Sequence, residues 1–252
     1  MFEYGRNSLN CNWHWASNCS KICNVIVTNE AVVPKAEYPK QRIIEQAAII
    51  FNQHGYVGTS IADIMKSTGL RRSSIYKHFR SKQEIAVAAF DYSLNSIVET
   101  AIDRVGREET AIDRLLAFVS TFQGFTTKPI CVGGCPVLNM AVESDDTHPE
   151  IRRHVQTAVN GIRALIGGII ELGIRQGEIV ATTDVEQAST VIFVTIEGAI
   201  MMSKLYGDDV YLDRAIIHLH QYIQKDLQLT KLVRDSAEWV VVEAKSSSWQ
   251  RA

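Results

Sequence analysis

Two short amphipathic segments with a glycine between them constrain the fold of this chain more than any other feature of its sequence. The first spans residues 61–68 and the second 72–79, and Gly69 lies in the turn that separates them. In the second segment Ile75 and Phe79 are four residues apart, which places both side chains on one face of a helix. Two helices joined by so short a turn are typical of a helix-turn-helix.

Capping signals predict where the helices of this region begin. Ser60 precedes the first segment and Asp63 follows three residues later, which is the arrangement of a capping box. Ser81 and Glu84 repeat this spacing after the second segment. They predict the start of a long helix that continues to about residue 105.

The rest of the chain also favours helices. Ala, Ile, Leu, Glu and Gln recur in long stretches without clusters of turn residues, and only five residues are proline. We therefore expect an all-α fold. Its further helices are predicted at 39–54 (closed by Gly55), 110–125, 136–144, 149–176 (capped by Thr147 and Glu150), 184–206 and 209–229.

Charge is distributed unevenly along the chain. Its 26 Lys and Arg residues and 28 Asp and Glu residues give a net charge of −2. Residues 35–82 hold nine basic and three acidic residues, a local charge of +6, whereas residues 83–252 hold 15 basic and 23 acidic ones, a local charge of −8. A basic block ahead of an acidic body indicates a head that binds a polyanion, with ordinary local fluctuation as the alternative.

The sequence predicts a cytoplasmic protein. The most apolar run, Val191–Met202, is interrupted by Thr195, Glu197 and Gly198. It falls short of the roughly 20 apolar residues that span a bilayer. No signal peptide pattern begins the chain, so we expect its five cysteines to be reduced thiols rather than a disulfide framework.

The second helix of a helix-turn-helix enters the major groove of DNA with its N-terminal residues first. Arginine can form two hydrogen bonds with guanine, and serine can serve several bases. The side chains expected to face base edges are Arg71, Arg72, Ser73 and Ser74. Those expected to contact phosphate oxygens are Tyr76, Lys77 and His78, then Lys82 at the start of the next helix, and Thr59 and Ser60 on the other side.

This segment resembles the TetR family of transcriptional regulators. The matching residues are Gly55-Tyr56, Thr59-Ser60-Ile61-Ala62-Asp63-Ile64, Gly69-Leu70 and Ile75-Tyr76-Lys77-His78-Phe79-Arg80-Ser81-Lys82-Gln83-Glu84-Ile85. The resemblance implies an all-helical dimer that binds a palindromic operator and usually represses until a small molecule binds its C-terminal domain. Arg71 and Ser73 depart from the usual Ser and Gly of the family, so the operator sequence cannot be inferred from the operators of relatives. The extra arginines favour G-rich half-sites.

On this resemblance the chain divides into an extension at 1–34, a DNA-binding domain at 35–85, a ligand-binding and dimerisation domain at 86–229 and a tail at 230–252. The last two predicted helices would pair with their copies as a four-helix bundle. The final helix carries an apolar stripe that fits this buried face but can equally face its own domain. The stripe consists of Leu212, Ala215, Ile216, Leu219, Ile223 and Leu227.

Bulky apolar side chains in the second domain are candidates for the lining of an effector pocket. Such residues line pockets that take drug-sized molecules, although each of them is more often plain core. The candidates are Phe118, Phe122, Phe125, Cys135, Leu138, Met140, Phe193, Met201 and Met202. His154 and Arg163 can orient an anionic ligand, or they can simply lie on a solvated face.

Cys135 offers an alternative means of sensing. It stands directly before a predicted helix that begins at Pro136, where the helix macrodipole is expected to lower the pKa of the thiol. Cys131 lies four residues earlier and can act as a resolving thiol. The segment resembles that of relatives that sense electrophiles or oxidants. The alternative, which we prefer, is that the Gly134-Cys135-Pro136 run only packs the helix start.

We expect no enzyme activity, no cofactor and no metal. Phosphate-binding, dinucleotide, nucleophile-elbow and zinc motifs are absent from the sequence. Cys11, His14, Cys19 and Cys23 have spacings unlike those of zinc modules. We interpret residues 1–34 as a disordered arm or as upstream sequence included by a wrongly chosen start. An enzyme or carrier with a relic helix-turn-helix is the least favoured class.

Overall fold

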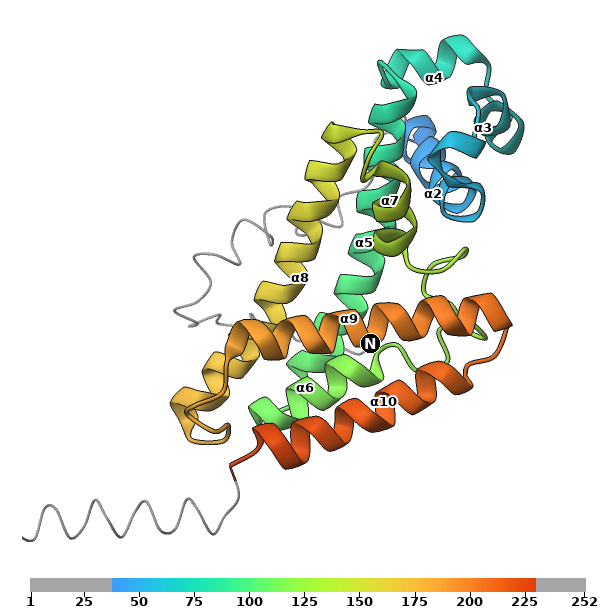
Figure 1. Cartoon of the computed structure of the whole chain (residues 1–252). Coiled ribbons are helices and arrows are strands. Elements are labelled where there is room, and N and C mark those ends of the chain that lie inside the picture. Colours follow the sequence, from blue (N-terminus) through green and yellow to red (C-terminus); the bar gives the residue numbers. More distant parts are fainter. Residues whose placement is uncertain (1–37, 230–252) are drawn as a thin grey trace, which may run out of the picture. The chain divides into compact units, whose positions relative to one another are not determined.

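A computed structural model of the chain describes residues 38–229 (Figure 1). Within this range the elements are α2 (Tyr38–Gly58), α3 (Ile61–Thr68), α4 (Arg72–His78), α5 (Lys82–Gly106), α6 (Ala111–Ser120), α7 (Pro136–Ser144), α8 (Pro149–Gln176), α9 (Val185–Tyr206), α10 (Val210–Tyr222) and a π-helical turn η1 (Ile223–Leu227). No strand occurs in this range, only one isolated antiparallel bridge between Ile179 and Gln228. The predicted all-α class is confirmed. The N-terminal Cys and His residues lie outside the described residues.

The predicted capping box at the start of α3 is confirmed. The Asp63 amide donates to the Ser60 hydroxyl over 3.2 Å, and the Ser60 amide donates to the Asp63 carboxylate over 2.8 Å. At the start of α5 the Ser81 hydroxyl accepts from the Glu84 amide over 3.1 Å. Both caps satisfy backbone donors that a helix leaves free, which is why α3 and α5 begin where the sequence predicts.

The predicted cap of α8 is wrong. The residue that precedes the helix is His148, and no side chain caps it. Thr147 donates its hydroxyl to the Glu143 carbonyl over 2.6 Å, and Glu150 accepts a hydrogen bond from Gln83 of α5. Pro149 explains the difference, because a residue before proline is kept out of helical geometry and proline suits the first helical position.

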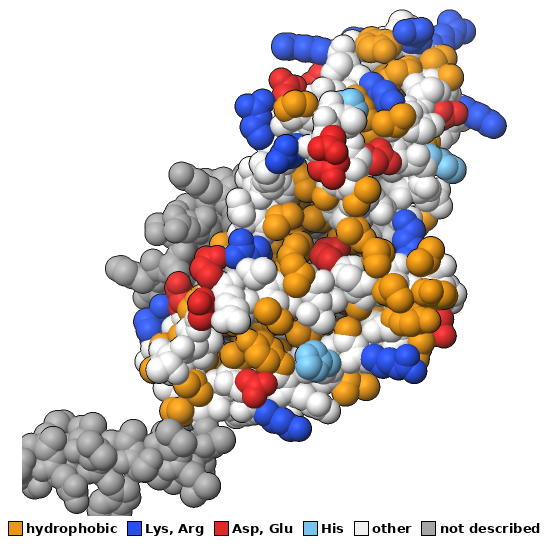
Figure 2. Space-filling view, viewed as in Figure 1, with side chains coloured by type: hydrophobic (Ala, Val, Ile, Leu, Met, Phe, Trp, Pro, Cys, Tyr) orange, Lys and Arg blue, Asp and Glu red, His pale blue; other side chains and the backbone are white. Residues whose placement is uncertain are grey.

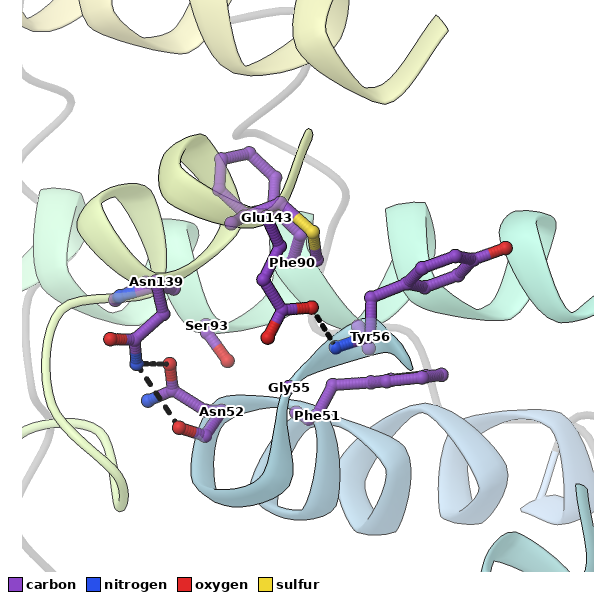
Figure 3. A pocket seen from close by; sticks show the side chains of 12 residues that line it. Phe51, Asn52, Gly55, Tyr56, Phe90, Ser93, Asn139 and Glu143 are labelled. Carbon is purple, nitrogen blue, oxygen red and sulfur yellow. Dashed lines mark hydrogen bonds between the residues drawn. The ribbon is translucent and has the colours of Figure 1, made fainter. Parts of the chain in front are cut away.

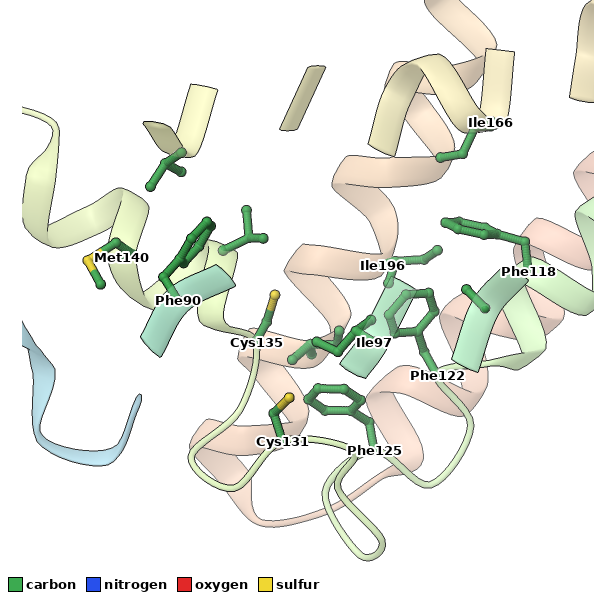
Figure 4. Packing of buried hydrophobic residues seen from close by; sticks show 14 of the residues in the cluster. Phe90, Ile97, Phe118, Phe122, Phe125, Cys131, Cys135, Met140, Ile166 and Ile196 are labelled. Carbon is green, nitrogen blue, oxygen red and sulfur yellow. The ribbon is translucent and has the colours of Figure 1, made fainter. Parts of the chain in front are cut away.

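Helix α6 is shorter than predicted. It ends at Ser120, whereas the periodicity of the phenylalanines predicts a helix to residue 125. Residues 121–127 form successive turns, and Gly124 has a positive φ of 71°. Phe122 and Phe125 are nevertheless buried, because the turns place Phe122 beside Phe118 and Phe125 beside Phe122 (Figure 4).

Helix α5 connects the basic head to the acidic body. Its N-terminal half packs against α2 of the head, and it also packs against α6, α7 and α8 of the body. The residues that it buries are Ile85, Ala86, Ala89, Phe90, Ser93, Ile97 and Ala101. Helix α7 lies close by and packs against both α2 and α5 (Figure 1). The head is therefore held by two elements of the body, α5 and α7.

Three helices of the described range are long and apolar enough to cross a bilayer by length and composition alone. They are α5, α8 and α9, with mean hydropathies of 1.2, 1.3 and 1.4. The sequence analysis, which searched only for uninterrupted apolar runs, did not identify them. All three contribute buried residues to the core, and packing inside the protein accounts for a part of their apolar character.

Candidate DNA interface

Helix α4 is fixed from within the head by buried apolar side chains. Ile75 of α4 and Ile64 of α3 are fully buried, and Phe79 directly after α4 is 3% exposed. Burial of one large apolar side chain contributes roughly 1.5–3 kcal/mol. These anchors explain how a helix of only seven residues holds a defined position.

The opposite face of α4 presents the residues that the sequence analysis selected for DNA. Arg71, Arg72, Ser73, Tyr76 and Lys77 are exposed. Figure 2 shows Lys and Arg side chains gathered at the end of the molecule where α3 and α4 lie. Two further selected residues, Ser74 and His78, are half-buried.

Two cation–π contacts orient the basic groups. The Arg72 guanidinium lies over the Tyr76 ring, 5.5 Å from its centroid, so both side chains follow the outer face of α4. The Lys82 ammonium lies over the Tyr56 ring at 4.4 Å. Partial burial lowers the pKa of Lys82, and the negative charge of Glu143 opposes that shift. Lys82 is thus a partly enclosed cation at the start of α5.

Thr59 does not fit the predicted phosphate contact. Its side chain is 1% exposed, and its hydroxyl donates to the Gly55 carbonyl over 2.7 Å. Thr59 therefore stabilises the end of α2. Ser60 is exposed, but its hydroxyl is engaged in the capping box with Asp63, whose pKa is lowered by the hydrogen bonds from Ser60.

The phenylalanines predicted to line a pocket form a packed cluster instead. Phe118 and Phe122 meet edge to face with ring centroids 5.7 Å apart, and Phe125 lies 6.2 Å from Phe122. All three rings are buried (Figure 4). Leu138 and Phe193 pack against the same core, whereas Met201 is 46% exposed on α9.

The two polar pocket candidates are paired with carboxylates. His154 of α8 lies 2.6 Å from Asp91 of α5, and this hydrogen bond raises the pKa of the imidazole. Arg163 forms an ion pair with Glu186, while its Nε atom is buried without a partner. The structure therefore does not bring His154 and Arg163 together with the phenylalanine cluster at a ligand-sized cavity.

Two hollows lie elsewhere in the described part of the chain. One is a cavity of about 20 Å³ between α2, α5 and α7 (Figure 3), which has room for about one water molecule. The other is an open groove of about 400 Å³ beside α7 and α8, lined by Ala141, Ser144, Asp145, Arg152, Val155, Gln156, Val159 and Asn160. Of the predicted pocket residues, only Met140 lines one of these two hollows, the small cavity.

The predicted lowering of the Cys135 pKa is wrong. Burial raises the pKa of this thiol well above its ordinary value, and the nearby charge of Glu197 raises it further. The Cys135 thiol donates to a Glu197 oxygen over 3.1 Å. Burial also raises the pKa of Cys131 to about 11. Because the thiolate is the reactive form, this environment opposes reaction of either cysteine.

A polar cluster that the sequence does not predict lies where the head meets the body. Glu143 of α7 accepts from the Tyr56 and Val57 amides at the end of α2. Asn139 donates to the carbonyl and side-chain oxygens of Asn52 over 3.0 and 2.7 Å (Figure 3). These contacts join residues more than 80 positions apart, so no local spacing in the sequence predicts them.

Comparison with known proteins agrees with the basic helix-turn-helix and the helical body. Residues 43–89 match the family described as bacterial regulatory proteins, tetR family, and residues 111–219 match the tetracyclin repressor-like C-terminal domain. A TetR transcriptional regulator from Chloroflexus aurantiacus J-10-FL is 37% identical, with a TM-score of 0.75 over 78% of this chain and 99% of that one.

Two further relatives extend the comparison. A TetR-family transcriptional regulator from Cytophaga hutchinsonii is 31% identical, with a TM-score of 0.75 over 80% of this chain and 100% of that one. The fatty acid metabolism regulator protein of Bacillus subtilis (strain 168) is 24% identical over 73% of this chain and 95% of its own length.

The fold and the exposed basic helix define a DNA-binding transcriptional regulator of the repressor kind. The chain belongs to the TetR family. Members of this family are regulators of transcription rather than enzymes, they are generally cytosolic, and they typically form dimers that respond to small molecules.

Proposed function

We propose that this protein is a cytoplasmic repressor that binds a palindromic operator as a homodimer and leaves it when a small molecule binds its body. The proposed DNA-binding domain is 35–85, and the proposed ligand-binding and dimerisation domain is 86–229. The observation that carries the proposal is the exposed face of α4. Arg71, Arg72 and Tyr76 are exposed there, while Ile75 and Phe79 are buried and hold the helix in place. Bases are read by Arg71, Arg72, Ser73 and Ser74, and phosphates are held by Ser60, Tyr76, Lys77, His78 and Lys82.

The proposal predicts selection of a two-fold symmetric DNA sequence from a random duplex library. Binding of the selected duplex, followed by fluorescence anisotropy, should weaken steeply as salt rises, because each phosphate contact releases a counterion. A scrambled duplex of equal length is the control and should bind about a thousandfold more weakly. Equal affinity for the selected and scrambled duplexes at every salt concentration would contradict the proposal.

The proposed dimer uses an apolar face of α9 and α10. The apolar stripe of the last helix does not serve this purpose, because Leu212, Ile216 and Leu219 are buried inside their own domain. Other large apolar side chains remain exposed on these helices: Val194, Met201, Leu205 and Tyr206 of α9 and Ile217 of α10. Figure 2 shows apolar side chains on this part of the visible surface. A second copy of the chain is the occupant that a family of dimers supports.

Charges placed on this face should separate the dimer. We expect the wild type to sediment as a dimer and the Met201→Glu, Leu205→Glu variant to sediment as a monomer, because an unpaired buried charge costs several kcal/mol. The control is Val142→Glu, which places one such charge on an exposed apolar residue of α7. If the double variant still sediments as a dimer at micromolar concentration, the dimer interface lies on another surface.

A thiol switch at Cys135 is the second candidate for sensing, and the site supports it less well. The buried thiol has a raised pKa and already donates to Glu197. An effector that binds in the body without reacting with a thiol therefore remains the first candidate. Because Phe118, Phe122 and Phe125 form a packed cluster, an effector that enters there requires this core to open. Such opening is a shift between two states with different affinities for the effector.

A further inference from the structure

Helix α2 breaks at Gly55, close to the DNA-binding helices. The backbone of Gly55 has φ of 78° and ψ of 170°, and a short helical turn of Tyr56, Val57 and Gly58 follows before α3 begins. A break of this kind leaves the amides after it without partners from the preceding turn. The positive φ favours glycine at residue 55, and a Cβ atom there would displace the Glu143 carboxylate.

A side chain of the body occupies this break. Glu143 of α7 accepts a hydrogen bond from the Tyr56 amide and a second from the Val57 amide over 3.2 Å (Figure 3). A carboxylate suits this position, because it adds negative charge to unsatisfied amides at the start of a helical turn. Glu143 therefore caps the last turn of α2 from across the boundary between head and body.

Tyr56 connects this cap to a proposed phosphate contact. Its ring is covered on one side by the Lys82 ammonium at 4.4 Å, and the His148 ring meets it edge to face at 4.8 Å. Lys82 begins α5, four residues after the end of α4. The backbone of Tyr56 is thus held by Glu143 and its ring supports Lys82.

A second set of hydrogen bonds holds the same end of α2. Asn139 donates to Asn52, and the Asn52 amide group donates to the Val132 and Gly134 carbonyls over 2.8 and 2.7 Å. Gly133 has φ of 98°, and a Cβ atom there would lie 2.6 Å from the Asn52 backbone, so the loop before α7 approaches α2 as closely as glycine permits.

The same loop is tied to the proposed dimer helix. Lys204 of α9 donates to the Gly133 carbonyl, and the Cys135 thiol donates to Glu197 of α9. Continuous hydrogen bonds therefore lead from α9 through the 131–135 loop and α7 to the end of α2.

We propose that Glu143, supported by Asn139, is a positioning residue that sets the angle of the DNA-binding head by clamping the broken end of α2 to α7. This inference rests on the proposed DNA-binding function and adds a second mechanical connection beside α5. With the clamp closed, the head has one orientation and Lys82 faces the phosphate backbone. With the Glu143 contacts broken, the packing of α5 and α7 against α2 restrains the head less tightly, and the binding-competent orientation becomes less populated.

The test measures head orientation and DNA affinity in the same full-length proteins. Spin labels on p-acetylphenylalanine at positions 66 in α3 and 171 in α8 report the head-to-body distance, with excess unlabelled protein to isolate one protomer. We expect Glu143→Gln to broaden this distance distribution and to weaken binding of the selected duplex about tenfold, because one charge-assisted acceptor is lost. Glu143→Ala should have the larger effect on both.

The control is Glu99→Gln, which removes the same charge from an exposed position of α5 and should change neither measurement. Thermal unfolding of every variant separates clamping from general destabilisation. A lower melting temperature with an unchanged distance distribution and affinity would overturn the proposal and leave Glu143 a purely local cap. If the wild type binds no duplex selectively, the proposed function fails, and the distance distribution alone still confirms or rejects the clamp.

Discussion

The Arg71→Ala, Arg72→Ala double variant is expected to bind the selected duplex between roughly 30-fold and 25,000-fold more weakly than the wild type. Both side chains are exposed at the start of α4, and Ile75 and Phe79 hold this helix from inside. A good bidentate contact from arginine to guanine contributes about 1–3 kcal/mol, and the two losses add unless the side chains share one base pair. Fluorescence anisotropy on the selected duplex measures the loss, with unfolding midpoints recorded beside it.

The control removes two positive charges away from the head. Arg107→Ala, Arg175→Ala has the same change in net charge, and both residues are exposed, each with a carboxylate four positions earlier. This variant should bind with nearly unchanged affinity, because screening at physiological salt reduces charge effects beyond about 8 Å. Equal losses in the two double variants would show that overall charge, rather than α4, governs binding.

Glu197→Gln is expected to stabilise the protein at pH 8 and to have little effect at pH 5. Burial raises the pKa of Glu197 to about 7 from an ordinary value of 4.5, and one of its oxygens is buried without a hydrogen-bond partner. Glutamine keeps the shape and an acceptor for the Cys135 thiol, and it cannot ionise. Ionisation of a buried carboxyl is the cost that this substitution removes.

The direction of the pH effect follows from the raised pKa. A carboxyl that binds its proton more tightly in the folded state contributes stability below about pH 4.5, and this stability is lost as pH rises through about 7. We expect a difference of ~2 kcal/mol at pH 8, less than the full linkage value because the side chain is only partly enclosed. Urea unfolding at fixed protein concentration, at pH 5 and pH 8, measures it. A difference that does not change between these pH values would show that Glu197 is ionised throughout.

Local signals in the sequence were sufficient to predict the positions of most of the helices. Caps and glycines depend on residues three or four positions apart, so Ser60 with Asp63 and Ser81 with Glu84 predict helix starts that the structure confirms. The same reasoning failed at Thr147 because Pro149 restricts the backbone of His148 more strongly than a hydroxyl cap can favour another start. It failed after Ser120 because helical spacing of buried rings can also arise from turns.

Some residues of the candidate site can likewise be predicted from local sequence patterns, and others depend on distant partners. The exposed face of α4 follows from helical periodicity, because the residues between Ile75 and Phe79 must point outward once these two point inward. Thr59 was misassigned because its burial depends on the break at Gly55 rather than on its own neighbours. The raised pKa of Cys135 and the cap of Glu143 depend on partners more than 60 positions away, which no single-sequence pattern can place.

The bridge between Ile179 and Gln228 has a consequence for how tightly two copies of the chain can associate. The Val180 amide donates to the Leu227 carbonyl over 2.9 Å and the Leu229 amide donates to the Glu178 carbonyl over 2.7 Å, so the loop between α8 and α9 is joined to the segment that ends η1 after α10. Helices α9 and α10 pack against each other, and the chain segments at both ends of the pair are connected, by the short turn after Tyr206 and by this bridge. The surface of these two helices is therefore ordered before a second copy binds. Association then costs little conformational entropy, which favours a long-lived complex with a modest contact area.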